Sequence, residues 1–190
     1  MREPIFDKSL LRHTIFIGIV CLCLFSCVKA RKLHAPAISD RALAPVLDVD
    51  SVSTLISDSG ITRYRITAPR WLIYDKASPS FWCFPKGIYL EKFSEDMQID
   101  ASLIADSARY LDSEGVWELW GNVHAVNERG ETFDTPLLIW EQREERIHSD
   151  SSITITRDAS VIIGVGFESN QTMTQYTILQ PTGYFPVESE

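Results

Sequence analysis

The sequence predicts an all-β fold built from repeated antiparallel strand pairs. Three observations support this prediction: apolar residues alternate with polar ones, short turn signals separate the alternating segments, and one pattern recurs at a nearly constant interval. After Ala44 no segment shows a sustained helical period. A sheet with one apolar face has to cover that face with a second sheet or curl around it. The expected architecture is therefore a β-sandwich or a jelly roll.

One sequence pattern recurs along the chain at a nearly constant interval. The dipeptides Ala68-Pro69, Ala101-Ser102 and Thr135-Pro136 are 33 and 34 residues apart, and Gly87 returns as Gly121 after 34 residues. A period of this size that carries strands rather than helices predicts stacked β-units, each of which buries its apolar face against its neighbours.

The alternation predicts twelve strands, over residues 49–57, 62–68, 71–75, 87–93, 98–105, 108–111, 116–120, 123–127, 132–141, 153–157, 161–167 and 174–179. Turn residues separate them, such as Asp58-Ser59-Gly60 and Glu128-Arg129-Gly130. Gly121 and Asn122 are also interpreted as a turn, so two hairpins are expected side by side between residues 116 and 141.

Alternation also assigns an inner and an outer face to each strand. Ile99 and Leu103 are expected on one face of their strand, and Phe133, Leu137 and Ile139 on one face of theirs. These faces are the apolar ones, so they are predicted to point toward the interior.

The N-terminus has the features of a bacterial lipoprotein signal. Basic residues precede an apolar run from Ile15 to Phe25, whose eleven residues are too few to span a bilayer but suit a secretory signal. The run ends in Leu24-Phe25-Ser26-Cys27, which resembles a lipobox. We therefore expect cleavage before Cys27 and acylation of its thiol, the alternative being an uncleaved short anchor helix.

These observations divide the chain into three parts. Residues 1–26 are predicted to be a signal peptide, 27–47 a lipidated cysteine followed by a polar, alanine-rich tether, and 48–190 the β-domain. Several acyl chains on Cys27 would hold the domain at a membrane far better than one chain.

Composition and motifs argue against several functional classes. The formal net charge of -8, without a cluster of Lys and Arg, opposes binding to nucleic acid. His34, His124 and His148 lack the spacing of metal ligands, and neither a nucleophile elbow nor a nucleotide-binding loop is present. We expect no enzymatic activity, no catalytic residue, no metal and no cofactor.

Four segments carry a pattern distributed over nearly the whole predicted domain. They are A-D-S-A-R-Y at 105–110, the stretch from W-E-L-W-G-N-V to L-L-I-W at 117–140, H-S-D at 148–150 and G-V-G-F-E-S-N at 164–170. This pattern resembles the LptC family of lipopolysaccharide export proteins, with Gly121, Asn122 and Gly130 as turn residues of its motif.

The resemblance implies a twisted open β-jelly roll at the periplasmic side of the inner membrane. Such a protein would accept lipopolysaccharide from an inner-membrane ABC transporter and pass it to a periplasmic bridge protein of the same fold. The well-known form of the family has an N-terminal transmembrane helix, whereas this sequence has the features of a lipoprotein.

A lipid path would be lined by apolar and aromatic side chains of the predicted strands. The candidates are Ile66, Trp71, Ile88, Leu90, Ile99, Leu103, Trp117, Leu119, Val123, Phe133, Leu137 and Ile139. A groove and a closed core use the same kinds of residue, so the sequence does not separate the two. Two alternatives stay open: the soluble bridge component of the same system, and a β-sandwich lipoprotein with a structural or glycan-binding role.

The first and last predicted strands are expected at the edges of the sheet, over residues 49–57 and 174–179. Edge strands recruit other strands through main-chain hydrogen bonds. By resemblance, the N-terminal end would contact the transporter and the C-terminal end the bridge protein.

Overall fold

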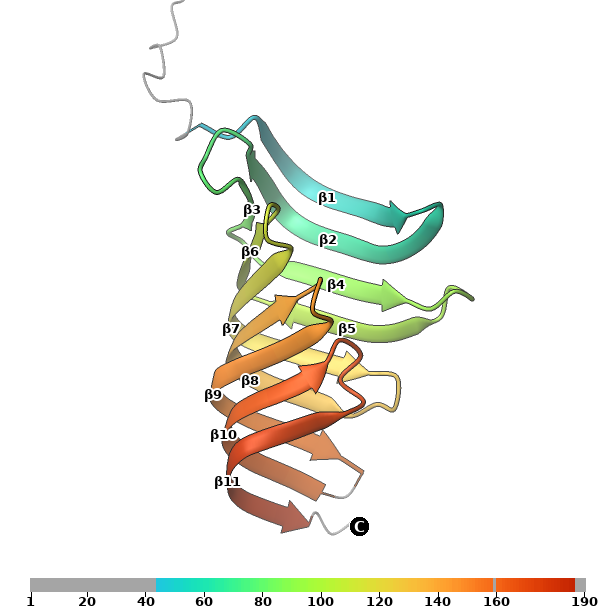
Figure 1. Ribbon diagram of the computed structural model, residues 1–190, viewed down its shortest axis with the longest axis vertical. Helices are drawn as coiled ribbons and strands as arrows, with labels where there is room; N and C mark the ends of the chain where they lie inside the picture. The colour runs from blue at the N-terminus through green and yellow to red at the C-terminus, as the bar shows by residue number, and fades with distance from the viewer. Residues whose placement is uncertain (1–43, 159, 187–190) are drawn as a thin grey trace, which may run out of the picture. The chain divides into compact units, whose positions relative to one another are not determined.

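The computed structural model describes residues 44–158 and 160–186, and every regular element in this part of the chain is a β-strand. The strands are β1 (Leu47–Asp58), β2 (Ile61–Tyr74), β3 (Phe81–Phe84), β4 (Ile88–Phe93), β5 (Ile99–Ala105), β6 (Ser107–Leu111), β7 (Val116–Asn127), β8 (Thr132–Glu141), β9 (Arg146–Arg157), β10 (Ser160–Asn170) and β11 (Tyr176–Pro186). They form one antiparallel sheet of 11 strands, which confirms the all-β prediction (Figure 1).

The predicted signal peptide, Cys27 and the tether as far as residue 43 lie outside the described residues. Within the described ranges, no helix has the length and apolarity needed to cross a bilayer.

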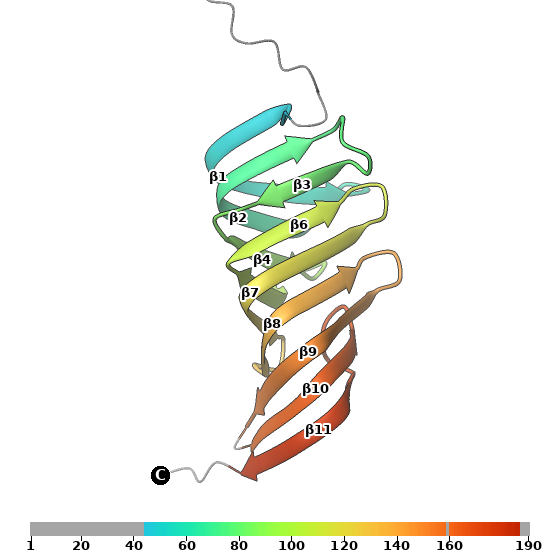
Figure 2. The ribbon, with the colours of Figure 1, turned by 90° about the vertical axis from the view of Figure 1, so that its left-hand side faces the viewer.

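Two long strands, β2 and β7, are linked to each other by two different routes. β2 pairs with β4 through residues 64–67 and with β3 through residues 72–74. β7 pairs with β5 through residues 124–127 and with β6 through residues 116–120. The pairs β4–β5 and β3–β6 complete the two routes. Between β2 and β7 the sheet therefore divides into two walls, which Figures 1 and 2 show from two sides.

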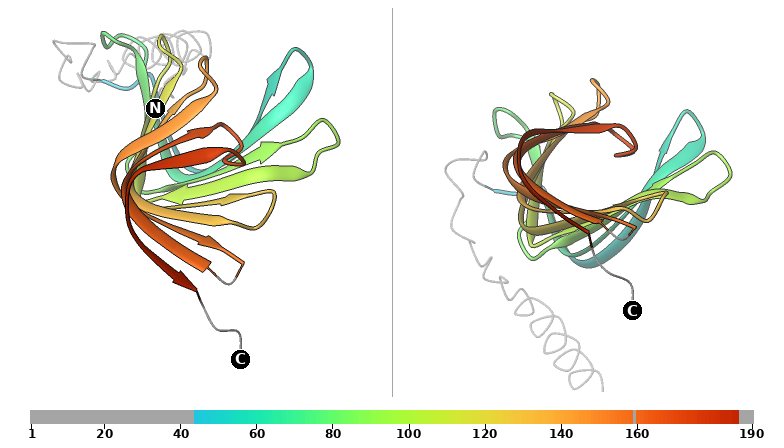
Figure 3. Two further views of the ribbon diagram at one scale, coloured as in Figure 1. Left: turned by 60° about the horizontal axis from the view of Figure 1, so that its bottom comes forward. Right: turned by 90° about the horizontal axis from the view of Figure 1, so that it is seen from below.

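The remaining strands extend this curled sheet without closing it. The strands β7, β8, β9, β10 and β11 follow one another as antiparallel neighbours, and they wrap into an incomplete ring (Figure 3). β1 pairs with β2, and β11 pairs with β10, so that these two strands form the edges of the sheet. The twisted open jelly roll and both predicted edge strands are confirmed.

A β-bulge in β7 replaces one of the predicted turns. Gly121 and Asn122 lie within the continuous strand, with φ angles of 74° and 44°, and the register with β8 shifts between Trp120 and Val123. A Cβ atom on Gly121 would lie 2.7 Å from Oδ2 of Asp106. Only glycine combines this left-handed backbone with so close a contact. The prediction that Gly121 and Asn122 reverse the chain was wrong, whereas Gly130 does lie in the turn between β7 and β8.

The bulge continues into β8, where it changes which side chains face the interior. Phe133 and Thr135 are buried, but further along the strand Leu138 and Trp140 are the buried residues. The register with β9 shifts in the same region. Pro136 lies at this point and has no N–H to contribute to a regular ladder.

Two buried hydroxyl groups satisfy the backbone carbonyl that the bulge leaves unpaired. The hydroxyl of Ser149 donates to the carbonyl oxygen of Leu137 over 2.6 Å, and the hydroxyl of Thr135 donates to the same oxygen over 3.0 Å. A buried carbonyl without a donor costs about 1–3 kcal/mol. These two polar residues are therefore buried because the bend of the sheet requires them.

Most of the predicted strands are present, with differences in β2, β3, β7 and β9. Residues 62–68 and 71–75 belong to one strand, β2, and residues 116–120 and 123–127 belong to one strand, β7. β3 was not predicted, and β9 begins seven residues before the predicted residue 153.

Candidate functional site: the apolar interior of the jelly roll

A cavity with apolar and aromatic walls lies inside the curl, between the two walls of the sheet. This interior cavity has a volume of about 340 Å³, within the range of small-molecule pockets. Its lining comes from β1, β2, β3, β4, β6, β7, β8 and the residue after β8, and consists of Ile56, Tyr64, Ile66, Trp82, Leu90, Tyr110, Trp117, Trp140 and Gln142.

Aromatic rings form a continuous chain along this cavity. Trp82 contacts Tyr110 with ring centroids 5.0 Å apart, Tyr110 stacks on Trp117 at 4.7 Å, and Trp117 stacks on Trp140 at 6.4 Å. Tyr64 then meets Trp140 edge to face at 5.4 Å. Each such pair adds about 0.5–1.5 kcal/mol beyond the burial of its area, so the rings hold this wall rigid.

The phenol of Tyr110 keeps its proton at neutral pH. Burial raises its pKa above the ordinary value for tyrosine, and the nearby carboxylate of Asp112 raises it further. The cavity is therefore lined at this point by a neutral hydrogen-bonding group on an apolar ring.

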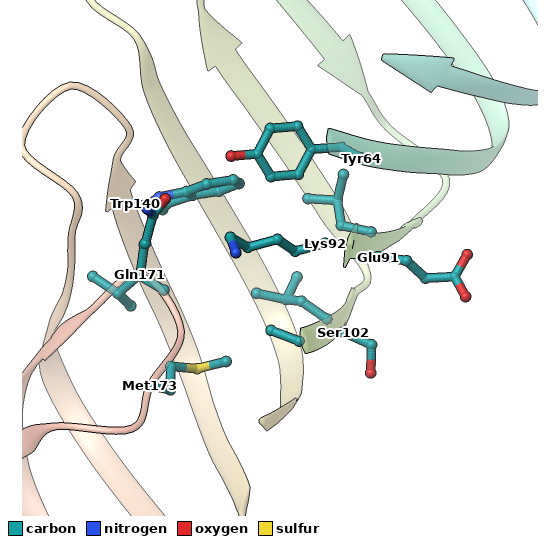
Figure 4. A pocket seen from close by; sticks show the side chains of 11 residues that line it. Tyr64, Glu91, Lys92, Ser102, Trp140, Gln171 and Met173 are labelled. Atoms are coloured by element: carbon teal, nitrogen blue, oxygen red, sulfur yellow. The ribbon is translucent and has the colours of Figure 1, made fainter. Parts of the chain in front are cut away.

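A second, smaller cavity adjoins the interior cavity and shares Tyr64, Leu90 and Trp140 with it. Figure 4 shows Lys92 pointing into this space toward Trp140, whereas Glu91 points the opposite way. The ammonium group of Lys92 lies 3.0 Å from Oδ2 of Asp100, and both side chains are about one-fifth exposed. This ion pair neutralises a charge that would otherwise face an apolar wall.

The β10–β11 hairpin tip inserts a methionine into the same space. Met173 is 2% exposed and belongs to the apolar core, and it lines the second cavity beside Gln171. Asn127, at the end of β7, holds the tip in place because its Nδ2 donates to the carbonyl oxygen of Met173 over 2.9 Å. The same amide donates to Oε2 of the buried Glu131 over 2.6 Å. Asn127 therefore joins two hairpin tips that are far apart in the sequence.

We expect Asn127→Asp to lower the free energy of unfolding by at least about 2 kcal/mol. An aspartate cannot donate to Met173 or Glu131, and it places a second carboxylate beside a buried one. Urea-induced unfolding measures the change. Asn122→Asp is the matched control, because Asn122 donates to Oδ2 of Asp106 over 2.7 Å at the exposed surface, where a change of less than about 1 kcal/mol is expected. Equal effects of the two changes would show that Asn127 does not hold the tip.

The structure gathers most of the predicted groove residues around the interior. The apolar core contains Ile66, Ile88, Leu90, Leu103, Trp117, Leu119, Val123 and Phe133, and Trp71 packs against it. Among them, Ile66, Leu90 and Trp117 line the interior cavity, and Leu103 lines the second one.

Three of the predicted groove residues do not belong to the apolar core. Leu137 and Ile139 are half-buried on the opposite face of β8 from Leu138, because the bulge at Pro136 shifts the alternation by one residue. Ile99 is 49% exposed, beyond the register shift between β4 and β5. The expected placement of Leu137 and Ile139 on the inner face with Phe133 was wrong because of this shift.

Sequence reasoning missed several side chains that line the interior cavity. Ile56, Tyr64, Trp82, Tyr110 and Trp140 were not among the candidates, although Tyr64 shares the parity of Ile66 along β2. That parity was a usable signal. Nothing in the sequence pattern indicated Trp82, because its strand, β3, was not predicted.

The fold and its interior define a class of protein: an open, single-sheet jelly roll that encloses an apolar, aromatic-lined space and has two unpaired edges. A comparison with known families finds the LptC family, described as lipopolysaccharide-assembly, LptC-related, over residues 19–183. The chain belongs to this family. No curated protein matches it.

Membership assigns the chain a role in lipopolysaccharide transport at the periplasmic side of the envelope. The family consists of transport-associated, non-enzymatic components. The resemblance seen in the sequence is thereby confirmed.

Proposed function

We propose that this protein accepts lipopolysaccharide from an inner-membrane ABC transporter into its apolar interior and passes it to a periplasmic bridge protein. The observation that carries this proposal is the interior cavity, which lies within an open sheet and borders the second cavity at Tyr64, Leu90 and Trp140. Its walls are apolar, so they suit acyl chains better than free sugars.

The energetics suit a passive path. Burying an acyl chain stabilises it by about 0.8 kcal/mol per methylene, and a bilayer offers nearly the same stabilisation. Transfer from a membrane into such a groove, or between two similar grooves, is therefore close to neutral. Direction has to come from the ATP that the transporter hydrolyses.

The two edges of the sheet differ in charge, which supports the proposed order of partners. β1 carries Asp50, and Asp48 in an ion pair with Arg70 of β2, and charged side chains on an edge strand oppose pairing with a further strand. β11 carries no charged residue along its length. Strand addition by a bridge protein of the same fold is therefore proposed at β11, and contact with the transporter at the N-terminal end.

Photocrosslinking in cells tests the proposal. A light-activated residue at Leu103, which lines the second cavity, is expected to form adducts with lipopolysaccharide. The matched control is Ile104, the next residue on the same strand, which is 50% exposed on the opposite face. Equal yields at the two positions, or no adducts in a folded protein, would contradict the proposal and favour the structural or glycan-binding alternative.

The proposed anchor is a set of acyl chains on Cys27, which would hold the domain at the inner membrane. We expect Cys27→Ala to abolish incorporation of labelled fatty acid and to move the protein from the membrane fraction to the soluble fraction. The physical reason is that several acyl chains together hold a membrane strongly, whereas the short apolar run before Cys27 does not span it. Unchanged membrane association of the variant would contradict lipid anchoring.

A further inference from the structure

The turn between β10 and β11 contacts the turn between β7 and β8, although the two turns lie at opposite ends of the strands. Antiparallel pairing places in one row across β7, β8, β9 and β10 the residues Val116, Glu141, Arg146 and Asn170. The β10–β11 turn follows this row, whereas Asn127 ends β7 at the opposite end. Only the curl of the sheet, which Figure 3 shows from below, brings the two turns together.

Side chains of the β7–β8 turn hold the β10–β11 turn, residues 171–175, which we refer to as the clasp. Nδ2 of Asn127 donates to the carbonyl oxygen of Met173 over 2.9 Å, and Nη1 of Arg129 donates to that of Thr174 over 3.3 Å. Among the described strands, β11 pairs with β10 alone. The ring that main-chain pairing leaves open is therefore closed at this point by side-chain contacts.

The clasp is a compact turn that can leave this position without loss of strand pairing. Oδ1 of Asn170 accepts from the main-chain N–H groups of Thr174 and Gln175 over 3.0 and 3.2 Å. The N–H of Met173 donates to the carbonyl oxygen of Asn170 over 3.0 Å. Release of the clasp breaks the two side-chain hydrogen bonds from the β7–β8 turn and exposes Met173, whose flexible, unbranched side chain suits a contact that forms and breaks.

The closed ring obstructs the way from the interior cavity to β11. The second cavity, next to the clasp, has a volume of only about 30 Å³, which suits a few water molecules rather than an acyl chain. Beyond it the curl is filled by side chains without exposed surface, which are Phe133, Ile153, Ile155 and Phe167. A lipid that keeps a large polar head group in water while its chains lie in the curl has to move along an open side. The clasp crosses that side.

We propose that the clasp is a gate, which rests closed on the β7–β8 turn and swings away when a lipid moves from the interior cavity toward β11. The head group then passes between the two turns, and the acyl chains displace Met173 from the core. This inference rests on the proposed function, because it takes the curl as the lipid path.

Tethering the clasp in cells tests the gate. In a Cys83→Ala background, which removes the free thiol of the described residues, Arg129→Cys and Thr174→Cys place one thiol on each turn. Methanediyl bismethanethiosulfonate joins the two thiols by a short bridge that dithiothreitol removes. Light-activated residues report on lipopolysaccharide at Ile56, which lines the interior cavity, and at Ile178, which packs against the core from β11.

The tether is expected to lower the yield of adducts at Ile178 by at least about tenfold, because the state that allows passage becomes rare. The yield at Ile56 should stay close to the untethered value, and dithiothreitol should restore the adducts at Ile178. The matched control is the same double variant treated with methyl methanethiosulfonate, which modifies both thiols without joining them.

A milder change tests the same gate without a tether. Arg129 is exposed, so Arg129→Ala removes a hydrogen bond to the clasp without disturbing the core. The ratio of adducts at Ile178 to those at Ile56 should rise by about twofold or more, the factor expected for one lost hydrogen bond. Glu128→Ala, a change at the exposed neighbouring residue, should leave this ratio unchanged.

The outcomes separate the gate from the proposed function. Unchanged adducts at Ile178, in protein whose tether is complete by mass spectrometry, would overturn the gate. An equal fall at Ile56, a wild-type chain that forms no adducts at Ile178, or an unchanged ratio in Arg129→Ala would overturn it as well. An absence of adducts at both Ile56 and Leu103 in the wild-type protein would overturn the function instead.

Discussion

Ile56→Asp is expected to lower the yield of lipopolysaccharide adducts by at least about tenfold, which corresponds to 1.4 kcal/mol. Ile56 lines the interior cavity from β1 and is half-buried. When the cavity is empty, water can hydrate the new carboxylate, so the domain should still fold. When an acyl chain enters, the charge loses this water without gaining a partner, and that desolvation opposes binding.

The neighbouring residue provides the control for this prediction. Leu55 is 52% exposed and points to the opposite face of the same strand, so Leu55→Asp adds the same charge outside the cavity. It should leave the adduct yield close to the wild-type value. Circular dichroism and thermal unfolding establish that both variants are folded. Similar losses in the two variants would mean that lipid does not occupy the interior cavity.

Leu138→Ala is expected to destabilise the domain by about 2–5 kcal/mol, because it removes a side chain with no exposed surface from the core and leaves a cavity. For a domain of this size each kcal/mol lowers Tm by about 2–4 °C, so a fall on the order of 10 °C is expected. Thermal unfolding followed by circular dichroism measures it.

Leu137→Ala is the matched comparison, since it makes the same change one residue earlier. Leu137 is half-buried and lies outside the apolar core, so a loss of about 1 kcal/mol or less is expected. This pair of variants tests the shift of the inner face at the bulge. A larger effect at Leu137 than at Leu138 would show that the regular alternation persists through β8, as the sequence pattern alone predicts.

The predictions for Ile56 and Leu138 test two different roles of apolar side chains in the interior of the sheet. Core residues such as Leu138 hold the curl together, whereas residues such as Ile56 and Tyr64 line space that a lipid can fill. Apolar side chains serve both purposes, and only their position relative to the cavity separates the two. This is why a groove could not be distinguished from a core before the walls were located.

Local features of the fold were predictable from the sequence. The positions of most strands and the turn at Gly130 followed from alternation and from turn residues. These features depend on neighbours a few residues apart, which a single sequence contains. β3 was not predicted because its four residues, Phe81–Phe84, are all apolar and are too few to show a period.

The candidate site was predictable only in part. Ile66, Leu90 and Trp117 were expected at the interior and line the cavity, because their strands alternate without interruption up to these residues. Leu137 and Ile139 were misplaced, because one extra residue at the bulge reverses every side chain that follows.

The sequence by itself determined the all-β class, the positions of most strands and the family, since periodicity and motif residues are local properties of the chain. Only the tertiary structure decided which side chains meet. The two walls between β2 and β7, the contact of Asn127 with Met173 across 46 residues, and the pairing of Trp117 with Trp140 all depend on strand register. Register is chosen by the burial of the whole sheet and by its bulges, so it is a property of the folded domain rather than of any one segment.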